Sequence, residues 1–457
     1  MKADISRSTF DPGKHYLRVL MQQGRVQLDA DFNEQAAILL HYLQTLAADL
    51  IGPFGGPAAG AGFEIKLDPN PVRRYHLSPG RYYVDGLLVE NEGDLDSGAA
   101  GSLLPRLPDG RRSLLYLDVW EREVLPVEDG RIREVALGGL DTALRSQLVW
   151  RVRAIDKRAD GSDIPETRNG DAKDWQAWLG QWQPANRGRL RAAAHRDPKD
   201  DNACLAAPEA RYHGAENQLY RVEVHRGGTM KGAIAPTFKW SRDNGSVIFP
   251  VLESAGDTVG LEHLGRDSRS GLKPGDWVEF VDVVVVAQEA GDPLTLFRVE
   301  AVDPRRTTVR LQAPKPDNQP QPDVPEHDGK SAFARHAFLR RWDHQEIAKS
   351  QGGTPLQNGA LRILEGENDA GWIALEDGIR IQFQPDGIYR AGDYWLIPAR
   401  TATGDVEWTQ GEDGRPEARK PYGADHHFAP LAVVEVDGAG KLEALQPLRK
   451  LFAPLEP

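Results

Sequence analysis

The residues whose types and spacing best suit ligand binding lie in the segment FKWSRDNGSV, at positions 238–247. The segment combines aromatic residues, two cations and a carboxylate with Asp243-Asn244-Gly245, a strong tight-turn signal between two apolar runs. We therefore predict a hairpin that holds Arg242 and Asp243 at an exposed tip. There the two side chains would form either a surface-binding site or an ion pair that shapes the turn.

Histidine is the residue type most suited to metal binding or acid-base chemistry, and none of the twelve histidines falls into a ligand spacing such as HExxH. The densest group contains His336, Asp343 and His344, which we interpret as solvated or salt-bridged side chains beside two arginines. The adjacent His426 and His427 would point to opposite faces of a strand and could not easily share an ion. The sequence therefore predicts no metal site and no cofactor.

Paired carboxylates could support glycoside hydrolysis, but their separation of about 5 to 10 Å in space corresponds to no fixed spacing along a chain. The pairs Asp118 with Glu121 and Glu376 with Asp377 consequently have no further support from the sequence. The glycine patterns of nucleophile elbows, P-loops and dinucleotide-binding turns are missing from the sequence. We expect no catalytic residues, and a protein that is not an enzyme.

Three tryptophans lie at helical spacing within the polar, irregular region 156–215. Trp175, Trp178 and Trp182 follow the pattern i, i+3 and i+7, which places their indoles on one face of a helix. This helix is either anchored to the β body by its tryptophans or offers them as a platform on which sugars stack. These three residues are therefore candidates for surface binding, together with the Arg242 and Asp243 pair.

Charge and cysteine content restrict the classes of partner. The formal net charge is −12 and no run rich in Lys or Arg occurs, which argues against nucleic acid and anionic membrane surfaces. No signal peptide and no apolar run of spanning length is found, so we expect cytoplasmic synthesis and no membrane insertion. The single cysteine, Cys204, excludes an internal disulfide and fits a reducing compartment.

An amphipathic helix follows an extended N-terminal arm. Apolar residues recur at spacings of three and four from Asp31 to Leu50, which predicts one helix of about five turns. Asp31 and Glu34 resemble a capping box, and the Gly and Pro residues of IGPFGGP end the helix. The apolar stripe packs either against another subunit or back onto the chain's own first sheet.

The remaining residues favour β structure. Short segments alternate apolar and polar residues between Pro-Gly and Asp-Gly turns, a pattern typical of antiparallel sheets. We predict a mainly β protein with one long N-terminal helix and several small antiparallel domains that are sandwich- or barrel-like. In chain order we expect an attachment module (residues 1–54), a first β domain (55–155), an irregular insertion with the Trp-bearing helix (156–215), a central β domain (216–314), a Pro-rich linker or loop (315–333) and a C-terminal β domain (334–457).

The opening residues resemble those of a known family. Residues 10–35, FDPGKHYLRVLMQQGRVQLDADFNEQ, are similar to the opening signature of a family of functionally uncharacterised bacterial proteins. Motifs like WSRDNGSV at 240–247, GDYWLIPAR at 392–400 and the His-rich segment 426–432 extend the resemblance over nearly the whole chain. Proteins of this family are associated with phage-tail-like contractile injection systems, and the opening is similar to attachment segments of phage tail-fibre and baseplate proteins.

The resemblance implies a non-enzymatic structural component, baseplate- or fibre-associated, within a particle that is assembled after cytoplasmic synthesis and is released or acts outside the cell. Its partners would be baseplate, sheath or tube subunits, or further copies of itself, with a trimer favoured. The alternative is a carbohydrate-binding or carbohydrate-active β protein whose partners are glycans. The attachment role is carried over to the arm and helix, with the candidate residues Arg18, Leu20, Arg25, Leu28, Phe32, Leu39, Leu43 and Leu46.

Overall fold

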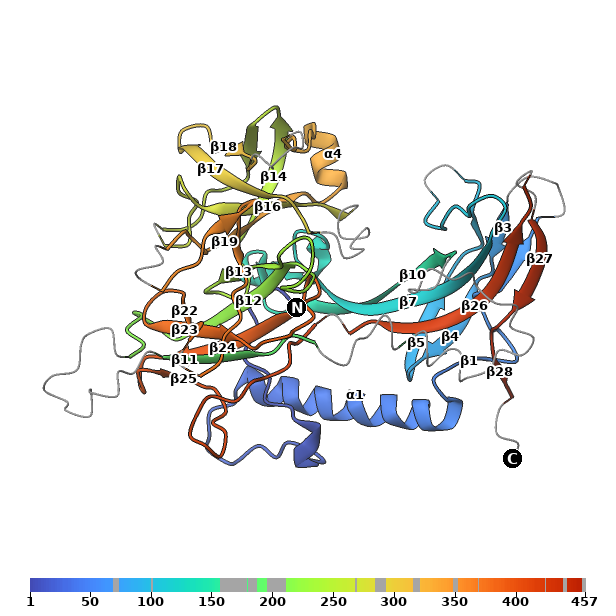
Figure 1. Cartoon of the computed structure of the whole chain (residues 1–457), viewed down its shortest axis with the longest axis horizontal. Coiled ribbons are helices and arrows are strands. Elements are labelled where there is room, and N and C mark those ends of the chain that lie inside the picture. The colour runs from blue at the N-terminus through green and yellow to red at the C-terminus, as the bar shows by residue number, and fades with distance from the viewer. Residues whose placement is uncertain are drawn as a thin grey trace, which may run out of the picture. The chain divides into compact units, whose positions relative to one another are not determined.

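The computed structural model confirms the predicted fold class (Figure 1). It shows one long helix near the N-terminus, several small and mostly antiparallel sheets, and a closed six-stranded barrel. The structure describes residues 1–68, 74–99, 102–156, 179, 187–194, 211–267, 269–283, 293–314, 321–347, 352–368, 370–423, 425–438 and 442–453.

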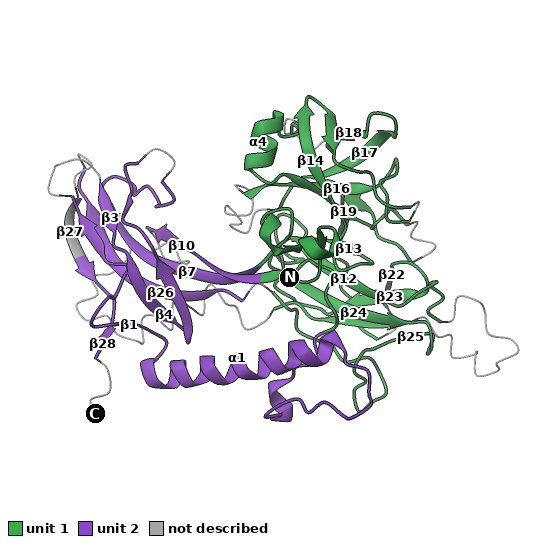
Figure 2. Ribbon diagram, turned by 180° about the vertical axis from the view of Figure 1, so that it is seen from behind, with its two compact units in different colours: residues 1–7, 123–145, 186–423 green, residues 8–122, 146–185, 424–457 purple. Residues whose placement is uncertain are grey.

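The chain divides into two compact units, each assembled from three separate segments (Figure 2). Unit 1 comprises Met1–Arg7, Glu123–Arg145 and Asn186–Gly423, and unit 2 comprises Ser8–Arg122, Ser146–Ala185 and Ala424–Pro457. The predicted domains were consecutive, whereas both units take strands from distant parts of the sequence.

Unit 2 begins with the arm, a short 3-10 turn (η1, Pro12–Lys14) and helix α1 (Asp29–Ile51). The helix starts two residues earlier than predicted, and its N-cap, Leu28, makes no side-chain cap. The predicted capping box is therefore wrong, because Glu34 instead accepts a hydrogen bond from Thr9 Oγ1 in the arm at 2.5 Å. No helix among the described residues is long and apolar enough to cross a membrane.

The core of unit 2 is formed by buried apolar side chains of its strands. In the first sheet β1 pairs in parallel with β28 and antiparallel with β4. The four-stranded sheets are β28-β1-β4-β5 and β10-β7-β26-β27, and a third sheet is β2-β3-β6. Their bounds, in chain order, are β1 Phe54–Pro57, β2 Ile65–Leu67, β3 Tyr75–Leu77, β4 Gly80–Val84, β5 Leu87–Asn91, β6 Leu95–Asp96, β7 Arg112–Val124, β10 Arg145–Ile155, β26 His427–Val436, β27 Leu442–Pro447 and β28 Leu451–Phe452.

Unit 1 contains the barrel, in the order β14-β15-β18-β17-β16-β19, and a short helix α4 (Gly329–Ala334). The closing strand β19 follows the predicted Pro-rich linker and pairs with both β14 and β16. The barrel therefore extends beyond the predicted central domain, because its closure needs a strand from the next segment. The barrel strands are β14 Ile248–Ala255, β15 Thr258–Leu261, β16 Trp277–Val281, β17 Leu296–Asp303, β18 Thr308–Gln312 and β19 Phe338–Trp342.

Two further sheets of unit 1 enclose a second apolar core. One has the order β20-β21-β13-β12-β24-β25 and the other β11-β23-β22, while β8 and β9 form a separate pair beside the short turns η2 (Gly130–Ile132) and η3 (Val135–Leu137). The strands are β8 Arg133–Glu134, β9 Leu140–Asp141, β11 Leu190–Ala194, β12 Gln218–Arg226, β13 Thr237–Ser241, β20 Leu356–Gln357, β21 Ala360–Arg362, β22 Ile373–Ala374, β23 Ile379–Phe383, β24 Tyr394–Arg400 and β25 Asp405–Val406.

The tight turn after Trp240 is present, but the predicted hairpin around it is wrong. Asn244 and Gly245 adopt positive φ angles of 51° and 65°, as a tight turn requires. However, β13 pairs with β12 and β21, and β14 pairs with β15 and β19. The turn therefore connects β13 of the six-stranded sheet to β14 of the barrel. The two strands pair with other strands and not with each other.

Candidate functional sites

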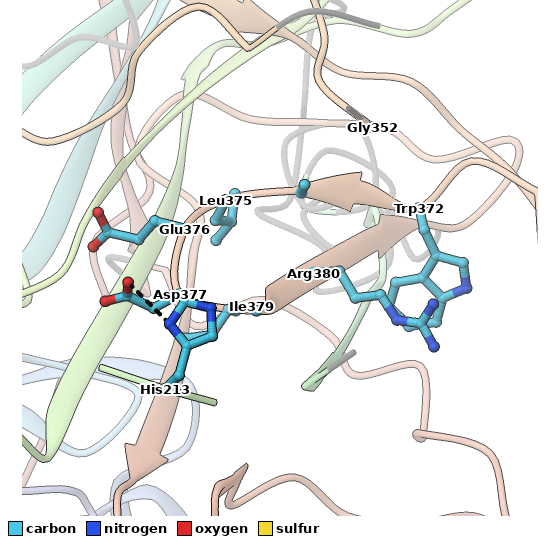
Figure 3. Close-up of a pocket in the computed structure, with 10 residues that line it drawn as sticks. His213, Gly352, Trp372, Leu375, Glu376, Asp377, Ile379 and Arg380 are labelled. Atoms are coloured by element: carbon cyan, nitrogen blue, oxygen red, sulfur yellow. Dashed lines mark ion pairs between the residues drawn. The ribbon is translucent and has the colours of Figure 1, made fainter. Parts of the chain in front are cut away.

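An open pocket of about 510 Å³ lies in unit 1 beside the β22–β23 hairpin (Figure 3). The turn of this hairpin places Asp377 and Gly378 in the left-handed region, with φ angles of 49° and 80°. Asp and Gly tolerate this conformation better than other residues. The turn holds Glu376 and Asp377 at one end of the pocket, while Trp372 and Arg380 lie at the other end.

Glu376 is the carboxylate with the most altered environment in this pocket. Its Oε1 accepts a hydrogen bond from Tyr220 Oη at 3.0 Å, and its Oε2 accepts one from Arg242 Nη2 at 2.8 Å. Burial raises the pKa of Glu376 to about 7, although the Arg242 guanidinium opposes the rise. Near neutral pH this carboxyl group can therefore hold or release a proton.

Asp343 contacts the arginine that binds Glu376. Its Oδ2 accepts hydrogen bonds from Ser241 Oγ at 3.1 Å and from the backbone N–H of Arg242 at 3.0 Å. The guanidinium groups of Arg242 and Arg341 lie 3.8 and 3.1 Å from its Oδ1. Arg242 therefore bridges two carboxylates, and its position is fixed from both sides.

The remaining polar groups of the pocket are partly exposed. Asp377 Oδ1 lies 3.6 Å from His213 Nδ1, and this ion pair is visible in Figure 3. At the far end the Arg380 guanidinium packs over the Trp372 ring at 4.5 Å. Hydrogen-bonding carboxylates and a half-exposed indole are the groups with which proteins contact a ligand that is both hydroxylated and partly apolar.

The structure changes the interpretation of the predicted surface pair. Arg242 and Asp243 are half-buried rather than exposed at a tip. Arg242 points to Glu376, and Asp243 lies 4.0 Å from Arg341. The sequence signal for Glu376 was its Glu-Asp-Gly turn between two alternating strands, but its partners Tyr220 and Arg242 lie more than a hundred residues away.

The histidine group of the sequence does not form a shared site. His344 is fully buried, with Nε2 2.7 Å from the carbonyl oxygen of Gly359 and its ring stacked on Trp277. Asp343, its neighbour, instead contacts the arginines described above. Among the described residues, no group of three His, Cys, Asp or Glu side chains is placed to hold a metal ion.

The adjacent His426 and His427, at the start of β26, contact different carboxylates, as expected for side chains that point in different directions. His426 Nδ1 lies 2.6 Å from Asp118 Oδ1, and His427 Nδ1 lies 2.9 Å from Asp85 Oδ2. Asp118 is almost fully buried and also accepts a hydrogen bond from Arg153 Nε at 2.6 Å. The buried carboxylate thus contacts the Arg153 guanidinium and the His426 imidazole, which gives Asp118 a structural role that the sequence did not indicate.

A buried charge cluster lies around residues 239–244 and the first residues of the chain. Lys2 Nζ lies 3.4 Å from Glu223 Oε1, and Asn244 Nδ2 donates to the carbonyl oxygen of Ala3 at 2.9 Å. Lys239 lies 3.1 Å from Glu223 and also pairs with Glu279 of the barrel. Burial alone would raise the pKa of Glu223, but Lys2, Lys239 and Arg221 hold it well below its usual value. This cluster therefore stabilises unit 1.

The arm and α1 expose a large apolar surface. Within α1, whose residues are all described, Ala30 and Ile38 are the buried residues. Phe32 is 73% exposed and Leu43 is 58% exposed, although both belong to the predicted stripe. The apolar stripe is therefore not folded back onto the chain's own first sheet. The exposed apolar residues of the arm and helix are Tyr16, Leu17, Leu20, Met21, Val26, Leu28, Phe32, Leu39, Leu40, Tyr42, Leu43, Leu46 and Leu50.

The arm is held beside the helix by specific contacts. The backbone N–H of Val19 donates to Gln35 Oε1 at 2.9 Å, and the rings of Phe10 and His41 lie 5.6 Å apart. Arg18 and Arg25 are exposed on either side of the turn at Gly24, where φ is 70°. All eight candidate attachment residues thus belong to one exposed segment. The three candidate tryptophans, Trp175, Trp178 and Trp182, lie outside the described residues.

Comparison with known proteins identifies the family of this chain. A family model described as a family of unknown function, DUF6519, matches residues 1–171 and 183–444. The chain therefore belongs to the DUF6519 family. No curated protein and no solved structure matches it.

Proposed function

We propose that this member of the DUF6519 family is a non-enzymatic structural component of a phage-tail-like contractile injection particle, associated with its baseplate or a fibre. It attaches to other subunits through the arm and α1. The resemblance of residues 10–35 to tail-fibre and baseplate attachment segments supports the particle context. The exposed apolar surface of the same residues supports the attachment role.

The single observation that carries this proposal is the exposure of the helix stripe. Phe32, Leu39, Leu43, Leu46 and Leu50 are between 43% and 73% exposed, and they follow one side of α1. Fully burying a side chain of this size contributes about 1.5 to 3 kcal/mol, so covering five half-exposed ones would contribute on the order of 5 kcal/mol. A stripe of this extent is a favourable surface for association with another protein.

The attachment is tested by capture from a lysate of the source bacterium. The tagged full chain should retain baseplate, sheath or tube subunits, identified by mass spectrometry, and the double variant Leu39→Asp/Leu43→Asp should lose them. Thr45→Asp is the control, because Thr45 is an exposed residue of the same helix and the substitution adds an aspartate outside the stripe. Equal capture by the wild type and the double variant would show that the stripe is not the attachment surface.

A second candidate function, carbohydrate binding, is favoured by the pocket of unit 1. Carboxylates at Glu376 and Asp377 can accept hydrogen bonds from sugar hydroxyls, and the indole of Trp372 can contact the apolar face of a sugar ring. This site belongs to a different unit from the arm and α1, so the two functions are compatible. Its mixed charges, with Arg380 and His213 beside the two acids, suit a neutral hydroxylated ligand better than a phosphate.

The carbohydrate function is tested by saturation-transfer NMR with glucose, galactose, mannose and N-acetylglucosamine. We expect transfer to the ring protons of at least one sugar, loss of this transfer in Trp372→Ala, and weakening in Glu376→Gln. Phe333→Ala is the control, because Phe333 is an aromatic residue that is 79% exposed on α4. Transfer that persists in Trp372→Ala, or none from any sugar, would reject this function for the pocket.

A further inference from the structure

The exposed stripe of α1 has a stricter period than an ordinary amphipathic helix. Its residues alternate steps of four and three without interruption over the whole helix. This is the heptad repeat of coiled coils, in which the first and fourth positions, a and d, form the contact between helices. The d positions are Phe32, Leu39 and Leu46, and the a positions are Ala36, Leu43 and Leu50.

The two sides of the helix are used in the way that a coiled coil requires. All six a and d residues are exposed, whereas most contacts of α1 with its own chain lie at positions b, c and f. One further contact lies at position g, where Gln35 Oε1 accepts a hydrogen bond from the backbone N–H of Val19. Ile38 at position c is buried, and the carbonyl oxygen of Gln44 at position b lies against Gly86. Glu34 and His41, at position f, contact the arm. The a and d positions are therefore left uncovered, while most of the occupied positions are those that a coiled coil turns away from its partners.

From this arrangement we infer that α1 forms a parallel coiled coil with α1 of other copies of the same chain, with three strands. Identical helices in register stack a on a and d on d, so a heptad seam complements itself. This inference rests on the proposed attachment role of the arm and α1. It adds that the helix binds two further copies of the same chain.

The flanking e and g positions favour three strands over two. In two-stranded coiled coils these positions commonly carry Glu and Lys, which pair across the interface. Here they are Asn33, Gln35, Leu40, Tyr42, Ala47 and Asp49, of which only Asp49 is charged. Leu40 and Tyr42 are 56% and 63% exposed and widen the apolar seam on both sides. Three copies around a closed rotation axis cover this wider seam, and their helices are necessarily parallel.

Solution mass tests the association directly. At tens of micromolar the full chain should have three times the 50.5 kDa mass of one copy. Leu39→Asp/Leu43→Asp should reduce the mass to that of one copy, while Thr45→Asp at position c should leave the trimer intact. A monomeric wild type, or equal dissociation by Thr45→Asp, overturns the coiled coil. A dimeric wild type overturns the three-stranded order.

Disulfide trapping tests the register and keeps the inference falsifiable if the aspartate variants fail to fold. In a Cys204→Ser background, Leu43→Cys at position a should form a disulfide-linked pair of chains on mild oxidation, and Thr45→Cys should not. Equal cross-linking at both positions overturns the parallel seam. A monomeric chain that still captures baseplate or sheath subunits overturns the coiled coil and leaves the proposed attachment standing.

Discussion

Arg242 and Glu376 lie 134 residues apart in the sequence, and the guanidinium Nη2 of Arg242 donates a hydrogen bond to Glu376 Oε2 at 2.8 Å. The same arginine faces Asp343 on its other side. The turn after β13, the turn between β22 and β23, and the end of β19 are therefore joined by one charged side chain. Because Glu376 is nevertheless buried enough to have a raised pKa, we expect this junction to respond to pH.

Replacing Glu376 with Gln should change how stability depends on pH. The pKa of Glu376 rises from 4.5 to about 7 on folding, mainly through burial. Between these values the folded chain keeps a proton that the unfolded chain releases, so this group's contribution to the free energy of unfolding falls as pH rises. The loss is at most about 3 kcal/mol. When unfolding in urea is measured from pH 4.5 to 8, the free energy of unfolding of Glu376→Gln should rise relative to that of the wild type as pH rises.

The control for this experiment is Glu253→Gln, because Glu253 is exposed on β14. Its pH profile should run parallel to that of the wild type. A constant difference between Glu376→Gln and the wild type over the whole range would mean that Glu376 is ionised at all these pH values, with Arg242 outweighing burial.

Replacing Lys239 with Met should destabilise unit 1 strongly. Lys239 is 4% exposed, pairs with Glu223 and Glu279, and lies 4.2 Å from the centre of the Trp342 ring. Removing one partner of a buried ion pair leaves an uncompensated charge and costs about 3 to 5 kcal/mol. The free energy of unfolding in urea measures this loss.

A surface ion pair provides the contrast for Lys239. Lys231 pairs with Asp386 at 2.7 Å, but both side chains are largely exposed. Solvent screens the charges of an exposed pair, so Lys231→Met should have little effect. Similar losses in the two variants would contradict the structural role assigned to the buried cluster.

The features of the fold that could be predicted are local ones. The apolar spacing of residues 31–50 indicated α1, and alternating strands between turn residues indicated a mainly β protein. Barrel closure could not be predicted, because Ile248 of β14 pairs with Arg340 of β19 across a long loop of sequence. The hairpin at residues 238–247 was predicted wrongly for the same reason: the turn was readable, but the partners of its two strands were not.

The candidate sites follow the same division. The stripe of α1 is periodic and could be identified from sequence, but its exposure could not, since a stripe packed on its own sheet has the same pattern. The Asp-Gly turn beside Glu376 could be recognised in the sequence. Its contacts with Tyr220 and Arg242 could not, because these residues are distant in sequence and meet Glu376 only in the folded chain. The contact between His426, just before β26, and Asp118 of β7 likewise joins segments that are distant in sequence.

Gly86→Ala should loosen the packing of α1 on unit 2. A Cβ atom at Gly86 would lie 2.1 Å from the carbonyl oxygen of Gln44, and backbone of the helix cannot move aside as a flexible side chain could. Gly110 is the matched control, because its φ is also positive, at 63°, and its Cβ would meet nothing within 4 Å. Gly110→Ala should cost about 1 kcal/mol from backbone conformation alone. Hydrogen exchange should therefore become faster in residues 29–51 of Gly86→Ala and remain unchanged there in Gly110→Ala, and equal exchange in the two variants would contradict the contact between the helix and the β4–β5 turn.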